Sequence, residues 1–158
     1  MISADVYLYT DGSSLGNPGP GGYGIRLEQV GSEYTKEYAQ GFIRTTNNRM
    51  ELLAVIKGLE LLKKKNLKVM VFSDSKYVID AVEKKWVFKW EKVNFKEKKN
   101  PDLWKRFLKV YQQHRVHFKW VKGHNNHPQN ERCDYLAVQA AKTMAIEHDV
   151  FFEGLSEK

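Results

Sequence analysis

The succession of hydrophobic patterns is the feature that most constrains the fold of this chain. Three stretches of β-type sequence come first, at residues 6–9, 23–30 and 33–42. From residue 47 to 65 the pattern takes the period of an α-helix. Strands at 67–72 and 116–121 then alternate with helices, the last of which is expected at 131 to about 147. This order predicts an α/β fold with a five-stranded mixed sheet (three antiparallel N-terminal strands plus two parallel strands) and helices packed on both faces.

Length and composition indicate a single globular domain over residues 1–158. The chain is 42% hydrophobic and 28% charged, and no apolar run approaches the roughly 20 residues that span a bilayer. The start lacks a basic region followed by an apolar stretch, and the one cysteine, Cys133, cannot form an internal disulfide. We therefore expect a cytoplasmic monomer without membrane contact. Its tail from about residue 149 carries no clear pattern and is expected to be loose.

A glycine-rich stretch, TDGSSLGNPGPGGYG, follows the first predicted strand. Its letters GPGGYG match the dinucleotide-binding pattern G-x-G-x-x-G, but that pattern requires a following helix to hold the pyrophosphate, and here a strand follows. The alternative is a wide hairpin in which Asp11-Gly12 is an ordinary turn pair. A hairpin explains the glycines but not why Asp11 closes an apolar strand.

Four acidic residues stand where predicted elements begin or end. Asp11 closes the first strand and Asp74 follows the 67–72 strand, while Glu51 and Asp134 fall in the first turns of the central and last helices. Because ligand sites in open α/β sheets form at the carboxyl ends of parallel strands, Asp11 and Asp74 should share one edge. Converging carboxylates can ionise together only around cations, and all-oxygen ligation favours Mg²⁺ or Mn²⁺ over zinc.

Each of these acids also has an ordinary structural explanation. Asp11 could be a turn residue, Asp74 the N-cap of its helix, and Glu51 an acid favoured by the helix dipole. Asp134 could be solvated beside Arg132. Taken singly these explanations are the commoner ones, whereas the four residues taken jointly favour a metal site.

Four long motifs carry a resemblance to a known family. TDGSSLGNPGPGGYG, TTNNRMEL, FSDSKYV and WVKGHNNHPQNERCD stand in the order and spacing of type 1 ribonuclease H. The chain resembles the bacterial single-domain enzymes of that family from about residue 6 to 145. The resemblance implies the ribonuclease H-like fold, and endonucleolytic hydrolysis of the RNA strand of RNA–DNA hybrids to 5′-phosphate and 3′-hydroxyl ends. It also implies catalysis by two Mg²⁺ ions, for which Mn²⁺ could substitute.

The resemblance assigns catalytic roles to five residues. Asp11, Glu51, Asp74 and Asp134 match the four catalytic carboxylates, which hold the metal ions. His124 matches the family's loop histidine, which assists the attacking water or product release. Without the motif, His124 would be taken for a surface loop residue.

Contacts to the two substrate strands are implied in the same way. Residues matching those that contact the minor-groove edge and 2′-hydroxyls of the RNA strand are Asn17, Asn47 and Asn48. Residues that fit the family's pocket for a phosphate of the DNA strand are Arg44, Thr46 and Asn100. Lys76 stands beside Asp74 where many members carry glutamine, and we expect it to contact a phosphate instead.

The positive charge is concentrated in one segment. The chain has a net charge of +7. Residues 84–99 (KKWVFKWEKVNFKEKK) contain seven lysines and two glutamates and therefore carry most of this charge. Lysines attract phosphates whatever the base sequence, and flat rings can pack on sugars or bases. The family has a basic protrusion here that grips the DNA strand, shorter in this chain than in the commonest bacterial version, with implied contacts from Lys85, Trp86, Lys89 and Trp90. The alternative is an amphipathic helix with buried aromatic residues and solvated lysines.

Two rival functions remain at this stage. A catalytically silent hybrid-binding module is disfavoured because all four acids are present. A related two-metal nuclease or transposase-like enzyme acting on DNA is disfavoured by the asparagine pair and by the close match of the histidine loop.

Overall fold

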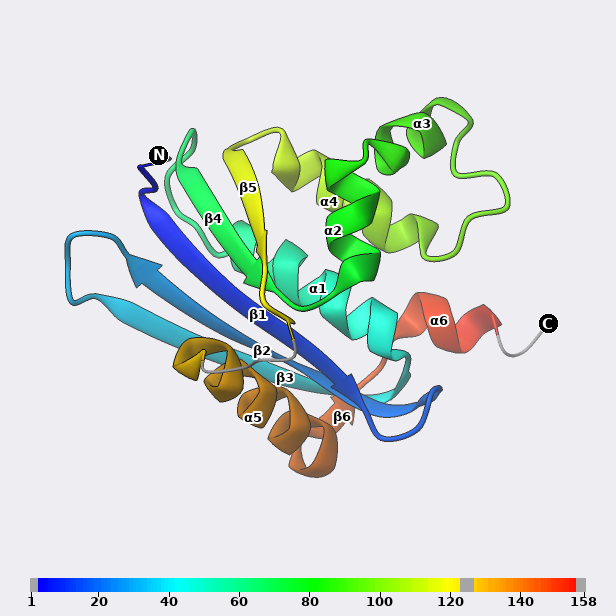
Figure 1. Cartoon of the computed structure of the whole chain (residues 1–158). Helices are drawn as coiled ribbons and strands as arrows, with labels where there is room; N and C mark the ends of the chain where they lie inside the picture. The colour runs from blue at the N-terminus through cyan, green and yellow to red at the C-terminus, as the bar shows by residue number, and fades with distance from the viewer. Residues whose placement is uncertain (1–2, 123–126, 156–158) are drawn as a thin grey trace.

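A mixed β-sheet forms the centre of the computed structural model, which describes residues 3–122 and 127–155 (Figure 1). The strands in these ranges are β1 (Val6–Ser14), β2 (Gly19–Gln29), β3 (Thr35–Thr45), β4 (Lys68–Ser73), β5 (Arg115–Trp120) and β6 (Ala145–Glu147). Their order across the sheet is β5-β4-β1-β2-β3-β6. β2 is antiparallel to both β1 and β3, whereas β1–β4, β4–β5 and β3–β6 are parallel pairs.

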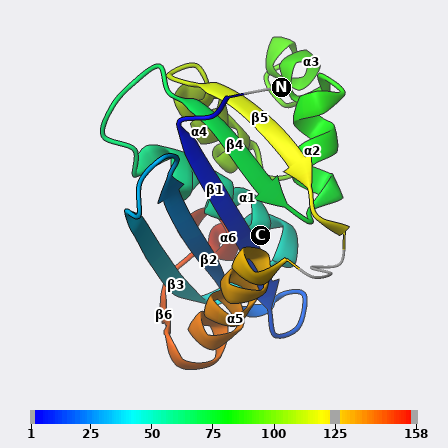
Figure 2. The same ribbon diagram turned by 60° about the vertical axis from the view of Figure 1, so that its left-hand side comes forward.

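Helices cover both faces of this sheet, as the sequence predicts (Figure 2). In chain order they are α1 (Asn47–Glu60), α2 (Lys76–Glu83), α3 (Trp86–Lys92), α4 (Pro101–Tyr111), α5 (Pro128–Thr143) and α6 (Val150–Leu155). α1 packs on β1 and β2 and is backed by α4, while α5 crosses β1, β2 and β3 on the opposite face. Among the described residues, no helix has the length and apolar character needed to cross a bilayer.

Close packing of α5 on the sheet depends on small residues at the contact. A Cβ atom on Gly24 of β2 would lie 2.3 Å from the carbonyl oxygen of Cys133 in α5, a distance that no real packing allows. On the other face, the fully buried Leu52, Ile56 and Leu59 of α1 belong to the main hydrophobic core. The sheet is therefore held rigidly from both sides at the strands that carry the acidic residues.

The prediction of a five-stranded sheet is wrong by one strand. The last long helix was expected to reach Glu147, but α5 ends at Thr143, and residues Ala145–Glu147 pair in parallel with β3 as β6. Three residues are too few to show an alternating pattern, so sequence periodicity cannot reveal such a strand.

In place of the loose tail expected from about residue 149, the structure has the short helix α6 beside the start of α1 (Figure 1). Asp149 precedes α6 and is buried, and its carboxylate pairs with the guanidinium of Arg49 at 2.7 Å. The rings of Phe151 and Phe152 lie 5.5 and 6.0 Å from the same guanidinium. One buried charge in α1 thus attaches the end of the chain to the domain.

Candidate active site

Three of the four predicted acids meet at one edge of the sheet. Asp11, Glu51 and Asp74 each present a carboxylate oxygen within 4.8 Å of the oxygens of the other two. The parallel pairing of β1 with β4 ends at Tyr9 and Phe72, so Asp11 and Asp74 each lie two residues beyond the last pair. This is the carboxyl-end position at which parallel strands present ligand sites.

A glycine allows the third acid to approach. Glu51 Oε1 accepts a 2.6 Å hydrogen bond from the backbone N–H of Gly12, which fixes the orientation of its carboxylate. A Cβ atom on Gly12 would lie 2.3 Å from the backbone nitrogen of Glu51. Only glycine at this position lets α1 lie close enough to β1 for the two carboxylates to share a site.

Burial and mutual repulsion control the charge of the cluster. Asp11 is 2% exposed and Glu51 is 6% exposed. Burial, followed by the charges of Asp74 and Asp134 and a hydrogen bond with Asp134, raises the pKa of Asp11 to about 9. Burial and the neighbouring charges of Asp11 and Asp74 likewise raise the pKa of Glu51 well above its ordinary value. Without a cation, Asp11 therefore favours its protonated form at neutral pH, and the charged form of Glu51 is disfavoured.

Asp134 joins this site from the opposite face of the sheet. It lies on α5, its side chain is exposed, and it interacts with Asp11 by a hydrogen bond and by charge. An exposed carboxylate beside a buried cluster can adjust its position when a cation binds. The four predicted acids are thus brought together, three as a tight group and Asp134 at its rim.

Two details of their predicted placement need correction. Glu51 lies in the second turn of α1, because this helix begins at Asn47 with Thr46 as its N-cap. Asp134 also lies beyond the first turn, because α5 begins at Pro128 rather than near residue 131. The structure also removes one alternative: the N-cap of α2 is Ser75, whose hydroxyl accepts from the N–H of Val78, so Asp74 has no capping role.

The cluster has the donor set that a divalent cation of the Mg²⁺ type prefers. Its ligands are carboxylate oxygens from three elements, and within the described ranges no histidine or cysteine belongs to the group. Mg²⁺ keeps several waters and needs few protein ligands, which matches three convergent carboxylates. The raised pKa values are also those expected of acids placed close together in a buried site, where a cation would favour their charged forms.

The predicted contacts to an RNA strand lie together beside the cluster. Asn17, in the loop between β1 and β2, accepts a 3.0 Å hydrogen bond from the backbone N–H of Asn47 at the start of α1. Asn17, Asn47 and Asn48 are all exposed. The glycine-rich loop and the start of α1 therefore present three amide side chains on a common surface.

Two of the residues predicted for a phosphate pocket, Thr46 and Asn100, contact the buried Arg49. Arg49, 2% exposed, donates to Asn100 Oδ1 at 3.2 Å and forms two bonds to the carboxylate of Asp102 at 2.9 and 2.6 Å. The Nδ2 group of Asn100 donates to the hydroxyl of Tyr77 at 2.9 Å. Both ends of the Asn100 amide are thereby oriented. Arg44 is exposed on β3.

The basic segment forms α3 and the turns that follow it, at the top of the view in Figure 1. Trp90 packs edge-on against the buried Trp104, with ring centroids 5.8 Å apart, whereas Trp86 is 41% exposed. Lys85 and Lys89 are exposed. Some rings of the segment therefore pack on the core, as expected for an amphipathic helix, whereas Trp86 and the lysines face outward, and the contacts to a DNA strand stay a prediction.

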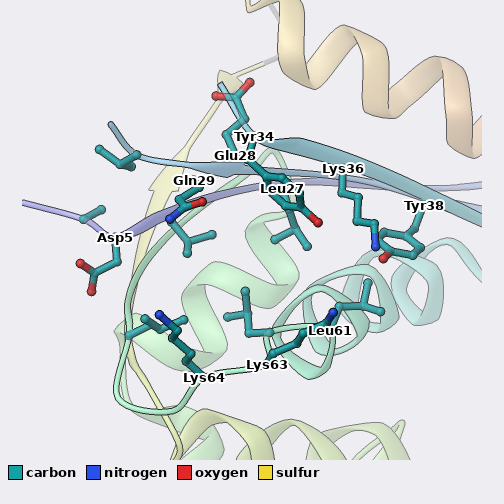
Figure 3. Close-up of a pocket in the computed structure, with 15 residues that line it drawn as sticks. Asp5, Leu27, Glu28, Gln29, Tyr34, Lys36, Tyr38, Leu61, Lys63 and Lys64 are labelled. Carbon is teal, nitrogen blue, oxygen red and sulfur yellow. The ribbon is translucent and has the colours of Figure 1, made fainter. Parts of the chain in front are cut away.

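A pocket of about 480 Å³ lies at the opposite end of the sheet from the acids (Figure 3). Its lining comes from the start of β1, the β2–β3 hairpin and the segment after α1, and includes Leu27, Tyr34, Leu61, Lys63 and Lys64. None of the four predicted acids lines it. This pocket is therefore separate from the candidate active site.

Sequence reasoning missed three residues that support the site. Arg49 and Asp149 form the buried pair described above, and Trp120 donates from its indole N–H to the carbonyl oxygen of Asp74 at 3.3 Å. The sequence offered two signals for these residues: an arginine within the motif TTNNRMEL and a tryptophan near the end of a predicted strand. His124 lies outside the described residues.

The fold and the carboxylate cluster together define an α/β protein of the ribonuclease H-like fold, with a site suited to divalent cations. The family model for RNase H matches residues 3–142, and the chain belongs to the ribonuclease H family. The predicted family is thereby confirmed.

Individual relatives agree with this assignment. A ribonuclease H of Desulforamulus reducens is 52% identical over 151 residues, which cover 92% of this chain and 93% of that protein. The solved structure of LC9-RNase H1, described as a type 1 RNase H with the type 2 active-site motif, is 33% identical, with a TM-score of 0.80, covering 91% of this chain and 75% of that one. LC11-RNase H1, solved in complex with an RNA/DNA hybrid, shares the fold at 24% identity and a TM-score of 0.66, over 87% of this chain and 96% of that one.

Proposed function

We propose that this protein is a divalent-metal-dependent endoribonuclease that hydrolyses the RNA strand of RNA–DNA hybrids. The observation that carries the proposal is the convergence of Asp11, Glu51 and Asp74 within 4.8 Å in a chain of the ribonuclease H family. The hybrid bound by LC11-RNase H1, a protein of the same fold, supports the choice of substrate.

The four acids would hold two Mg²⁺ ions, or Mn²⁺ in their place. When bound, such a pair stabilises the attacking and leaving oxygens of an in-line phosphoryl displacement, which leaves 5′-phosphate and 3′-hydroxyl ends. Metal binding would favour the ionised forms of Asp11 and Glu51, and the Gly12 N–H keeps the Glu51 carboxylate aimed at the site. Asp134, exposed at the rim, completes the ligand set.

His124 would assist the attacking water or the departure of the product. Its replacement by alanine should slow turnover by about 10²-fold, the range of general acid–base catalysis, without abolishing it. Single-turnover and steady-state cleavage of a labelled hybrid measure this effect. A variant as inactive as Asp11→Asn would instead make His124 a metal ligand.

Strand selection would come from the two surfaces on either side of the cluster. The amides of Asn17, Asn47 and Asn48 can exchange hydrogen bonds with 2′-hydroxyls, the groups that distinguish RNA from DNA. The DNA strand would place a phosphate against Arg44, Thr46 and Asn100, and further phosphates near Lys85, Trp86, Lys89 and Trp90. Phosphate contacts of this kind position a duplex, whereas the 2′-hydroxyl contacts decide which strand is cut.

The deciding experiment compares three labelled substrates, an RNA–DNA hybrid, duplex DNA and duplex RNA, with Mg²⁺ and with EDTA. We expect cleavage of the hybrid alone, only with Mg²⁺, and none by Asp11→Asn. Binding without cleavage would identify a silent hybrid-binding module. Cleavage of duplex DNA would identify a related two-metal DNA nuclease, and either result would overturn the proposal.

A further inference from the structure

Trp120 stands beside the acid cluster with much of its ring uncovered. It is the last residue of β5 and pairs with Ser73 of β4, directly before Asp74. The indole N–H donates to the carbonyl oxygen of Asp74 at 3.3 Å, and the side chain is 41% exposed. An exposed tryptophan contributes less to the core than a buried one, so its ring face is available for another contact.

That contact is made by Lys76. Its Nζ atom lies 3.9 Å from the centroid of the Trp120 ring, well within the range of a cation–π interaction. The other cation–ring distances in residues 3–122 and 127–155 lie between 5.2 and 6.0 Å. Asp74, Lys76 and Trp120 therefore form one compact unit, in which the indole touches both the peptide of a cluster acid and the ammonium group.

The charge of Lys76 is not used inside the described fold. Lys76 is exposed and is the first residue of α2, where the helix dipole disfavours a positive charge. It forms no ion pair with a carboxylate among the described residues. A cation held in an unfavourable place next to several acids is well suited to meet an incoming anion.

We infer that Trp120 is a positioning residue, which holds the Lys76 ammonium where it contacts a phosphate of the strand bound at the acid cluster. This inference rests on the proposed function and deepens it. The backbone of a nucleic acid is a polyanion, so a fixed positive charge beside the cluster helps to seat it. A free lysine side chain loses rotamer entropy when it binds, and the indole face limits that loss in advance.

The test is a double-mutant cycle of Lys76→Gln and Trp120→Leu, read by hybrid binding in EDTA from about 50 to 200 mM salt. Lys76→Gln should lower the log–log salt slope by about one unit and weaken binding several-fold. Trp120→Leu should weaken binding by about 2- to 5-fold in the wild-type background, where Lys76 is present. In the Lys76→Gln background it should have no effect, because the indole acts through the ammonium group. In Mg²⁺, both changes should raise KM more than they lower kcat.

Two conservative variants and a control separate positioning from simple structural support. Trp120→Phe keeps a ring beneath Lys76 but loses the bond to Asp74, and Lys76→Arg keeps the charge, so both should retain the wild-type salt slope. The control is Lys36→Gln, which removes a lysine packed at 5.7 Å on Tyr38 at the other end of the sheet, and it should leave hybrid binding unchanged. These variants also keep the test valid if Trp120→Leu fails to fold.

Three results would overturn the inference: equal loss of binding by Trp120→Leu in both backgrounds, loss of the salt slope in Trp120→Phe, or a lowered melting temperature with unchanged binding. Failure of the proposed function would look different, since wild-type protein would then not cleave the hybrid in Mg²⁺.

Discussion

Replacing Asp11 with asparagine should make the metal-free protein more stable while abolishing its activity. The carboxyl is 2% exposed and lies beside Glu51 and Asp74, so its charged form is disfavoured in the folded state. Burial, followed by the neighbouring carboxylates of Asp74 and Asp134, raises its pKa from 3.8 to about 9. At neutral pH Asp11 is ionised in the unfolded chain, so its carboxylate must take up a proton when the chain folds. Asparagine has nearly the same shape and needs no proton.

The size of the effect follows from proton linkage. A group with pKa 3.8 unfolded and about 9 folded costs about 1.4 kcal/mol of stability per pH unit between those values, so stability falls as pH rises through that window. At pH 7 the cost reaches about 4 kcal/mol, an upper limit because Glu51 and Asp74 relax when Asp11 is neutral. We expect about 2 kcal/mol, or roughly 4–8 °C in melting temperature for a domain of this size.

The assay is urea unfolding in EDTA between about pH 4 and 9 for wild type, Asp11→Asn and a matched surface variant, Asp80→Asn. The stabilisation by Asp11→Asn should grow with pH, and saturating Mg²⁺ should shrink it by stabilising the wild type alone. Asp80 pairs with Lys84 at 3.8 Å on α2, and its replacement should change stability by less than about 0.5 kcal/mol. A stabilisation that is absent, or equal at both ends of the pH range, would refute the reasoning.

Three further predictions concern the metal, the chain end and the basic segment. Calorimetry in buffers of different ionisation enthalpy should show proton release when Mg²⁺ binds at pH 7, with affinity rising toward about pH 9; binding without proton release would contradict the raised carboxyl pKa values. Asp149→Asn should cost about 2–3 kcal/mol in urea unfolding, less than the ~3–5 kcal/mol of a fully broken buried pair, because the Arg49 guanidinium keeps its second carboxylate partner. Changing Lys85, Lys89 and Lys92 together to alanine should raise KM with kcat nearly unchanged and lower the salt slope of hybrid binding by up to about three units; unchanged KM and slope would make these lysines a solvated face.

Long, regular elements could be predicted from the sequence. The 3.6-residue period of α1 and the β-type runs of β1 to β5 record which side of each element is buried, so they are visible without any knowledge of neighbours. β6 and α6 could not be predicted in this way. They have three and six residues, and both form against partners far away in the chain, β3 and Arg49.

The candidate site shows the same division. The sequence by itself determined which acids stand at element ends and, through four ordered motifs, the family to which the chain belongs. Only the tertiary structure decided that Asp11 and Glu51 are buried with raised pKa values, and that Trp120 joins Lys76 to Asp74. The physical reason is that a local pattern reports hydrophobic burial along one element, whereas a pKa or a cation–π contact depends on distances between residues brought together by the order of the strands.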